Sequence, residues 1–241
     1  MNYKAVLQYD GTRYRGWQTQ GNTDNTIQGK LETLLTKMAG EPVEVNGSGR
    51  TDAGVHAAGQ VISFRCKTKE SPEEICRYMN EYLPEDIAVL TVEEAAPRFH
   101  ARLNAVRKTY VYRIWNAPVR NVFRRRFTTW IQKPLDLDAM EQAATLLCGT
   151  HDYRAFCSLK KFKKSTVRTI EKIEIGKMGQ EIRISYTGDG FLYHMVRILT
   201  GTLVEVGLGL RKPEEMTEIL EGQDRTKAGR LMPPEGLTLE S

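Results

Sequence analysis

The chain has 241 residues, a mass of 27.4 kDa and a formal net charge of +5, with an isoelectric point near 9.0. This length suggests one large domain or two domains of ~100–150 residues each. Hydrophobic residues make up 40% and charged residues 27%, a balance that excludes a wholly disordered chain. No apolar run approaches the ~20 residues of a membrane span, and the first residues lack the layout of a signal peptide.

The cysteines and the charge indicate where the protein works. The four cysteines are scattered and form no C-x-x-C pair, which argues against a zinc site and a disulfide framework. We therefore expect a soluble protein of the reducing cytoplasm. The basic balance favours a polyanionic partner, although many basic proteins bind nothing acidic.

Strand and helix patterns alternate in the first half. Apolar residues at period two predict a strand over 3–9. Thr26 can cap a helix whose apolar stripe ends at Gly40. The run Ser71-Pro72-Glu73-Glu74 is a strong helix start, because it combines a cap residue, a proline at the first helical position and acids at the positive end of the dipole. Further strands are predicted at residues 61–64 and 87–92.

A similar alternation restarts in the second half. The expected elements are a strand over 108–115, a helix over 137–148, a hairpin of 167–175 with 181–186 turning at 176–179, a buried helix over 191–205, and a last helix from 212 to Gly222. Because strands and helices interleave throughout, the sequence predicts an α+β protein. We expect a joint near 103–107, which gives an N-terminal half over 1–104 and a C-terminal half over 105–241.

The segment 46–59 carries four glycines around one arginine, one aspartate and one histidine. A phosphate-binding P-loop is excluded because no Gly-Lys-Ser/Thr follows, and a dinucleotide fingerprint is excluded because Asp52 stands where glycine is required. What remains is a carboxylate on a glycine-rich turn with Arg50 two residues before it. Asp52 could be a covalent nucleophile that a guanidinium orients. Alternatively, Asp52 caps a helix and pairs with Arg50 in an ordinary turn.

The stretch GRTDAGVHA at 49–57 resembles the signature of the tRNA pseudouridine synthase A family. Other motifs resembling that family occur in the expected order: YDGT at 9–12 with YRGWQ at 14–18, FHAR at 99–102, KTYVY at 108–112, GFLYHMVR at 190–197 and PPEGL at 233–237. The resemblance covers nearly the whole chain. It implies the pseudouridine synthase fold, in which two ferredoxin-like halves join in a largely antiparallel central sheet flanked by helices.

The resemblance also implies an activity. Members of this family isomerise uridine to pseudouridine at positions 38, 39 and 40 in the anticodon stem and loop of tRNA, and they need no metal or other cofactor. They work as homodimers, with the tRNA lying across both subunits. By this analogy the half 1–104 carries the catalytic aspartate loop, and the half 105–241 completes the active-site cleft.

Three residues receive roles from the resemblance. It makes Asp52 the nucleophile, Tyr110 the residue that stacks on the target base, and Arg197 the ion-pair partner of the aspartate. An aspartate is ionised at neutral pH without tuning, so Arg50 and Arg197 would orient it and balance its charge. Whether the carboxylate attacks C6 of the base or C1′ of the sugar stays open.

Each role has a plainer alternative. By pattern alone Tyr110 is a core residue of a strand, and Arg197 could lie on a helix surface. A position between apolar neighbours favours burial of Arg197 beside a carboxylate, because a buried charge needs a partner. Phe191 and Leu192 could wall the base pocket, or they could simply pack in the core.

Basic runs supply candidate RNA contacts. Basic residues interleave with aromatics over 13–17, a pattern suited to phosphate and base contacts, and runs at 124–126 and 160–164 have the character of exposed loops that could grip an RNA backbone. The histidines show no metal spacing, although His56 is close enough in sequence to Asp52 to line the site. Two rival functions stay open: an RNA-binding module without chemistry, and a sister synthase that acts on a neighbouring tRNA region.

Overall fold

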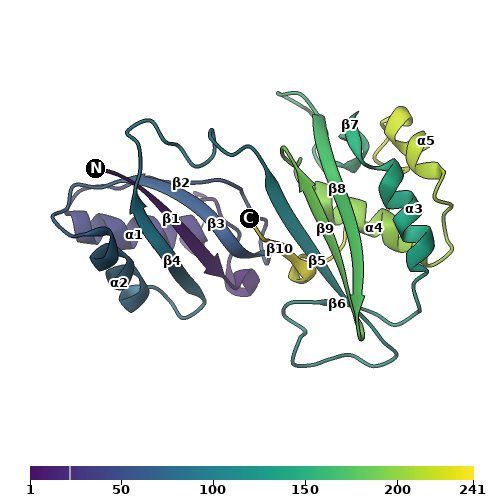
Figure 1. The fold of residues 1–241 in the computed structure, drawn as a ribbon, viewed down its shortest axis with the longest axis horizontal. Helices are drawn as coiled ribbons and strands as arrows, with labels where there is room; N and C mark the ends of the chain where they lie inside the picture. The colour runs from purple at the N-terminus through teal and green to yellow at the C-terminus, as the bar shows by residue number, and fades with distance from the viewer. Residues whose placement is uncertain (22) are drawn as a thin grey trace. The chain divides into compact units, whose positions relative to one another are not determined.

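The computed structural model describes residues 1–21 and 23–241, and it divides them into two compact units. Unit 1 comprises Met1–Val106 together with Thr238–Ser241, and unit 2 comprises Arg107–Leu237. The last four residues return to unit 1 because Thr238 and Leu239 pair in parallel with the strand that begins at His56. The division at 104/105 by sequence places these four residues in the second half. Figure 1 shows the helices and strands of both units.

Unit 1 has the element order β-α-β-β-α-β of a ferredoxin-like half. Its elements are β1 (Asn2–Tyr9), η1 (Gly11–Arg13), α1 (Ile27–Ala39), β2 (Val45–Gly47), β3 (His56–Arg65), α2 (Pro72–Tyr82) and β4 (Ile87–Glu94), with β10 (Leu237–Leu239) added at the end of the chain. β1 lies between β4 and β3, and both pairings are antiparallel. β2 also pairs antiparallel with β3.

Local sequence signals explain the elements of unit 1. The side chains of β1 alternate, and Tyr3, Ala5, Leu7 and Tyr9 are buried, which confirms the predicted period of two. The predicted starts of both helices are also confirmed. Thr26 accepts a hydrogen bond from the Gly29 amide at the start of α1. α2 opens with a complete capping box.

Unit 2 repeats the β-α-β-β-α order with additions. Its elements are β5 (Lys108–Asn116), β6 (Thr129–Ile131), α3 (Leu137–Leu146), β7 (Gly149–Asp152), η2 (Arg154–Phe156), β8 (Val167–Met178), β9 (Glu181–Gly188), α4 (Met195–Gly207), α5 (Glu215–Gly222) and η3 (Pro234–Gly236). β9 lies between β5 and β8, and β7 follows β8, all antiparallel. β6 runs parallel to β5. The three helices gather beside the sheet (Figure 1).

The α+β class and the two ferredoxin-like halves are therefore confirmed, while several boundaries differ from those predicted. β3 begins at His56, five residues before the predicted strand, because it pairs with β1, β2 and β10 along its length. The β8–β9 hairpin turns at Gly179-Gln180 rather than over 176–179, since Met178 already pairs with Glu181 and Gly179 has a φ of 61°. α3 ends at Leu146, two residues before the predicted end.

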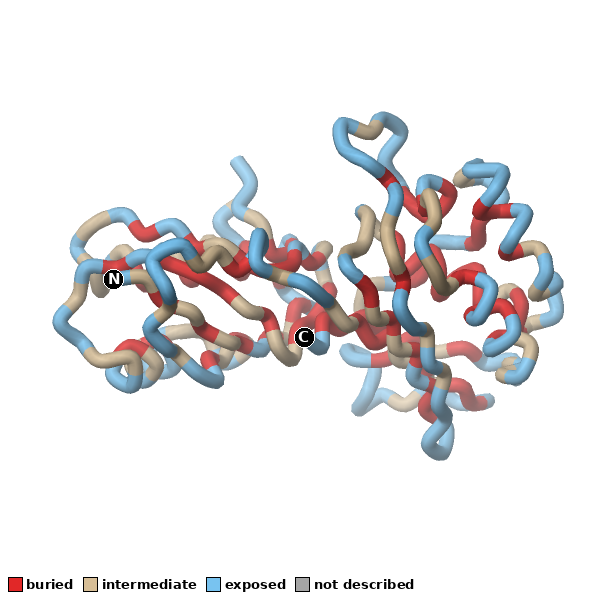
Figure 2. The backbone as a smooth tube through the Cα atoms, turned by 45° about the horizontal axis from the view of Figure 1, so that its top comes forward, coloured by how far each residue is buried: buried red, intermediate tan, exposed pale blue. Residues whose placement is uncertain are grey.

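The prediction that the buried helix starts at residue 191 is wrong. α4 begins at Met195, because His194 adopts a left-handed conformation with φ 65°, which cannot continue a helix. Residues 190–194 consequently form a connecting segment before the helix. From Met195 onward α4 is almost wholly buried, as predicted. In Figure 2, buried residues are red and lie inside each unit, whereas the exposed loops are pale blue.

Candidate active site

Asp52 lies in the loop that joins β2 to β3. It opens a tight turn in which the Val55 amide donates to the Asp52 carbonyl at 3.1 Å, and Gly54 supplies the positive φ of 78°. The Asp52 side chain is partly exposed. Because a strand and not a helix follows at His56, Asp52 has no helix to cap. The helix-cap interpretation of this motif is therefore wrong.

The start of the Asp52 loop is held by Gln60, a fully buried residue of β3. Its Oε1 accepts hydrogen bonds from Ser48 Oγ at 2.8 Å and from the Gly49 amide at 3.2 Å. Its Nε2 donates to the Gly49 carbonyl at 2.7 Å. One buried side chain thus satisfies both backbone groups of Gly49, which would otherwise be costly to bury.

The segment that follows β1 holds the rest of the loop. The Tyr9 hydroxyl bonds to Thr51 Oγ1 at 2.7 Å. The Trp17 amide donates to the Thr51 carbonyl at 3.0 Å, and the Gly54 amide donates to the Tyr14 carbonyl at 3.3 Å. Backbone positions on both sides of the aspartate are therefore tied to one short stretch of chain.

Two glycines make this close approach possible. Gly16 has a φ of 98°, and a Cβ atom there would lie 2.9 Å from the Thr51 carbonyl oxygen. A Cβ atom on Gly11 would lie 1.9 Å from the Val55 carbonyl oxygen. Any side chain at either position would push the segment 9–17 away from the aspartate loop.

The same segment corrects the predicted base contacts of residues 13–17. Tyr14 and Trp17 are only 5% and 2% exposed, so their rings cannot stack on RNA bases. The Tyr14 hydroxyl donates to Asp86, and Arg13 forms an ion pair with the same carboxylate at 2.8 Å. The aromatic residues of this run support the aspartate loop from inside unit 1.

Arg50 is exposed, and a second guanidinium lies near it. Partial burial, together with the positive charge of Arg102, lowers the pKa of Arg50 from its ordinary value, and the group stays protonated. Within residues 1–21 and 23–241, neither arginine forms an ion pair with a carboxylate. Two neighbouring cations in unit 1 without a carboxylate partner favour an anionic ligand.

His56 has a structural role in the same unit. It is buried, and its Nδ1 accepts a hydrogen bond from the Gly11 amide at 3.1 Å. The Asp10 carboxylate lies 3.2 Å from the same nitrogen. His56 therefore helps to hold the segment that supports the aspartate loop.

In unit 2, the structure brings together Tyr110 and Phe191, two residues that the sequence marks as candidates. Tyr110 lies on β5 and is 8% exposed, and its ring meets that of Phe191 edge to face with centroids 5.3 Å apart. Phe191 and Leu192 are half-buried in the segment 190–194. Phe191 thus borders the Tyr110 ring.

Tyr112, two residues further along β5, differs from Tyr110. It is fully buried, and its hydroxyl bonds to Thr129 Oγ1 at 2.6 Å and to the Pro233 carbonyl at 2.8 Å. Burial raises the pKa of Tyr112 above its ordinary value. Tyr112 is thus a structural residue, whereas Tyr110 lies beside a half-buried loop.

Arg197 lies on α4 and is buried, as predicted, with 8% of its surface exposed. Its Nε donates to the Met232 carbonyl at 2.7 Å, and the Met232 amide donates back to the Arg197 carbonyl at 3.3 Å. Met232 immediately precedes the PPEGL motif, whose Pro233 receives the Tyr112 hydroxyl. Arg197 of the GFLYHMVR motif thus contacts the residue next to PPEGL, and Tyr112 of the KTYVY motif contacts PPEGL itself.

The two basic runs of unit 2 are exposed loops, as expected. Arg124 forms an ion pair with Glu181 and lies over the Trp115 ring, 5.8 Å from its centroid. Burial alone would raise the pKa of Glu181, but ion pairs with Arg183 and Arg124 lower it. The lysines of 160–164 are exposed, and within the described chain none of them has an ion-pair or hydrogen-bond partner.

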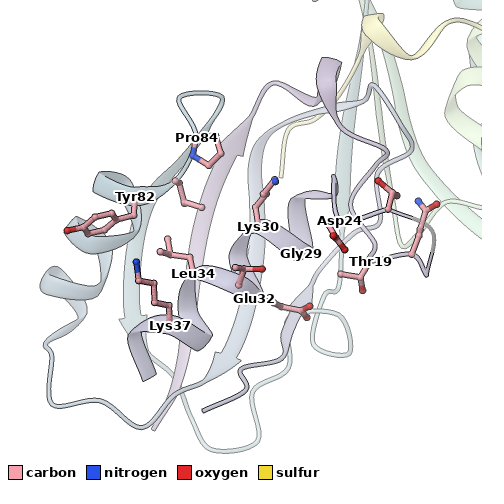
Figure 3. A pocket seen from close by; sticks show the side chains of 13 residues that line it. Thr19, Asp24, Gly29, Lys30, Glu32, Leu34, Lys37, Tyr82 and Pro84 are labelled. Carbon is pink, nitrogen blue, oxygen red and sulfur yellow. The ribbon is translucent and has the colours of Figure 1, made fainter. Parts of the chain in front are cut away.

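A surface pocket of about 640 Å³ lies beside α1 in unit 1 and contains none of the predicted site residues (Figure 3). Its wall includes Lys30, Glu32, Lys37 and Tyr82, and Lys37 lies 6.0 Å from the centroid of the Tyr82 ring. Both charge signs occur on this wall, so its composition favours no single class of ligand.

Sequence reasoning missed Gln60, Gly16 and Arg102. Gln60 reads as an ordinary polar position of a strand, and its role appears only once β3 faces the aspartate loop. Gly16 stands inside a quoted motif, but nothing in the local pattern indicates which backbone it approaches. Arg102 lies about fifty positions from Arg50, so only the fold can place the two charges near each other.

Comparison with known proteins identifies the family. The family model described as tRNA pseudouridine synthase matches residues 5–104 and 143–241. Among curated relatives, tRNA pseudouridine synthase A of Bacillus sp. (strain KSM-64) is 50% identical over 228 residues, covering 95% of this chain and 93% of the relative. The protein of the same name from Brevibacillus brevis is 47% identical over 236 residues, covering 98% and 96%.

A tRNA pseudouridine synthase A 2 from Bacillus anthracis is 44% identical over 240 residues, covering 100% of this chain and 98% of the relative. A solved structure of a Cbf5–Nop10–Gar1 complex contains a chain that is 12% identical, with a TM-score of 0.38 and coverage of 84% and 45%. The family model and the full-length relatives are decisive: this chain belongs to the tRNA pseudouridine synthase family and is an enzyme of the isomerase class.

Proposed function

We propose that the protein isomerises uridine to pseudouridine at positions 38, 39 and 40 in the anticodon stem and loop of tRNA, with Asp52 as the nucleophile. The observation that carries the proposal is the environment of Asp52. The chain on both sides of it is fixed by Gln60, Tyr9, Trp17 and the Gly54 amide, while its own side chain stays partly exposed. A rigid backbone with an accessible carboxylate suits covalent attack.

The reaction needs no second reactant. The bond between C1′ and N1 breaks, a bond between C1′ and C5 forms, C5 loses its proton to solvent and N1 gains one. Because atoms and electrons balance within the nucleoside, no redox or group-transfer cofactor is required. The carboxylate bonds transiently to C6 of the uracil or to C1′ of the sugar, and it is released once the C1′–C5 bond has formed.

The candidates in unit 2 supply the surroundings of the base. A target uridine must leave its stack, and the Tyr110 ring replaces the lost stacking. Phe191 and Leu192 wall the same base. Arg50 and Arg197 contribute the positive charge that the ionised nucleophile and the phosphates need.

We further propose that the protein acts in the cytoplasm as a homodimer, with tRNA lying across both subunits. All four cysteines are free thiols, which suits a reducing compartment. Light scattering tests the assembly: we expect a mass near twice 27.4 kDa at working concentrations. A strictly monomeric protein with full activity would remove the two-subunit arrangement.

The site of modification is tested by mapping pseudouridine in tRNA from cells with and without this protein. Positions 38, 39 and 40 should lose the modification together, and the purified protein alone should restore it to the unmodified tRNA. If the lost pseudouridines lie elsewhere in tRNA, the sister-synthase interpretation is correct. If the purified protein binds tRNA without modifying it, the binding-module interpretation is correct.

A further inference from the structure

The segment between β9 and α4 carries a second aromatic ring besides Phe191. Tyr193 is 49% exposed, and its ring stacks on that of His194 with centroids 3.7 Å apart and an angle of 26° between the planes. Two residues earlier, Phe191 contacts Tyr110. An exposed, supported ring therefore lies close in the chain to the residues proposed to receive the target base.

The position of this ring is fixed from a second segment. The Ser158 amide donates to the Tyr193 carbonyl at 3.3 Å, and Ser158 Oγ bonds to His194 Nδ1 at 2.9 Å. His194 holds a left-handed φ of 65°, which is unusual for a residue with a side chain. Such a conformation persists only where the surroundings maintain it, and it often marks a functional position.

Ser158 also begins the basic loop 158–164. Within this loop Phe162 turns back to Arg154, whose guanidinium carbon lies 5.5 Å from the ring centroid. The four lysines at 160, 161, 163 and 164 are exposed and, in the part of the chain that the structure describes, have no carboxylate partner. Ser158 contacts Tyr193 and His194, and the first of these lysines follows it two positions later in the chain.

We propose that Tyr193, supported by His194, is a second stacking platform that binds the base of a nucleotide adjacent to the target uridine, while the lysines of 158–164 bind the phosphates of that strand. When a uridine leaves its stack, its neighbour loses a stacking partner, and an aromatic face can replace it. Unpaired positive charge favours an RNA strand over a protein partner at this surface. The inference rests on the proposed function, because it assumes that Tyr110 receives the target base.

The experiment measures affinity for a synthetic anticodon stem–loop RNA with the full-length protein. Three variants are compared: Tyr193→Ala removes the ring, Tyr193→Phe keeps it, and Tyr82→Ala removes an equally exposed tyrosine (55%) in unit 1. We expect Tyr193→Ala to raise Kd about tenfold or more. The Tyr193→Phe and Tyr82→Ala variants should stay within about twofold of the parent. Thermal unfolding checks that each variant is folded.

A second RNA series identifies the base. Abasic nucleotides replace, one at a time, the residues on the 5′ and 3′ sides of the target uridine. At one of these positions the parent protein should lose affinity to the level of Tyr193→Ala, and Tyr193→Ala should lose nothing further. If Tyr193→Ala is unstable, Ser158→Ala, which removes only the hydroxyl contact to His194, should show a smaller loss of the same kind.

Three outcomes overturn the inference: a Kd for Tyr193→Ala equal to that of the parent, an equal effect of Tyr193→Ala on the intact and on both abasic RNAs, or a changed protein mass in light scattering with unchanged RNA affinity. The last outcome would assign Tyr193 to a contact between copies of the chain. The readout is binding, so it is independent of turnover. If pseudouridine forms at the expected positions while the abasic series shows no effect, the proposed function stands and this inference fails.

Discussion

The Asp52 loop and the segment 190–194 are positioned in different ways. Around Asp52, backbone amides and carbonyls make most of the fixing contacts, and two glycines allow chain to lie directly against chain. In the segment 190–194, more of the fixing contacts come from aromatic rings and polar side chains. Phe191 contacts the Tyr110 ring, and His194 contacts Tyr193 and Ser158. We therefore expect the segment 190–194 to adjust more readily than the Asp52 loop, because side chains rotate more easily than a hydrogen-bonded backbone shifts.

This difference matches what each region is proposed to do. A nucleophile must be held ~3–3.5 Å from the atom that it attacks with little positional error, so a rigid backbone is an advantage. A base-binding surface must accept different neighbouring nucleotides, and stacking tolerates any base because every base has a π-face. Variants in each region test this contrast.

Replacing the nucleophile should abolish the chemistry and spare the fold. Asp52→Asn is nearly isosteric, but an amide is a very poor nucleophile, so turnover should fall by roughly three orders of magnitude or more. Loss of a negative charge should leave tRNA binding equal or slightly tighter. Release of tritium from uridine labelled at C5 measures turnover, and thermal unfolding measures the stability of the fold. Conversion at a tenth of the parental rate would show that Asp52 is not the nucleophile.

Adding a methyl group at Gly16, which lies against the Asp52 loop, should displace Asp52. Gly16→Ala introduces a Cβ atom 2.9 Å from the Thr51 carbonyl oxygen at a φ of 98°, so it should lower stability by about 1–3 kcal/mol and turnover by an order of magnitude or more. Gly40→Ala is the matched control, because Gly40 also has a positive φ, 69°, but open space around it. It should cost only about 1 kcal/mol and leave turnover unchanged. Equal turnover in the two variants would contradict a rigid aspartate loop.

Removing the Tyr110 hydroxyl should separate binding from chemistry. Tyr110→Phe keeps the ring, so tRNA affinity should stay within about twofold, whereas turnover should fall about tenfold if the hydroxyl helps to remove the C5 proton. Tyr112→Phe is the control, since its hydroxyl bonds to Thr129 and to the Pro233 carbonyl. That variant should lose about 1–3 kcal/mol of stability instead. Full activity of Tyr110→Phe would reduce Tyr110 to a stacking surface.

Neutralising the basic loop should have the mildest effect. Substituting glutamine for Lys160, Lys161, Lys163 and Lys164 should make the slope of log K against log[salt] less negative by ~0.7–0.9 for each phosphate that the loop no longer neutralises. Turnover at saturating tRNA should change little, because these side chains lie outside the proposed chemistry. An unchanged slope would show that this loop does not bind the RNA backbone.

Local patterns in the sequence were sufficient to predict much of the fold. The alternation over 3–9, the caps at Thr26 and Ser71, and the restart of alternation at Lys108 all depend on contacts within a few residues, and the structure confirms them. The motif GRTDAGVHA and its companions likewise identified the family, which the comparisons confirm.

Other features required tertiary structure, because they depend on residues far apart in the chain. Tyr14 and Trp17 are buried, so their rings are not available to RNA. Instead, their backbone groups form hydrogen bonds with the Asp52 loop. Pairing of β10 with β3 returns the last four residues to unit 1.

The start of α4 and the role of Gln60 are also tertiary effects. His194, which Ser158 contacts across 36 positions, takes the left-handed conformation that delays the helix to Met195. Gln60 becomes a support only because β3 runs beside the loop that it bonds. A local pattern encodes which residues favour a helix or a strand, but the partner of a buried polar group is set by the path of the whole chain.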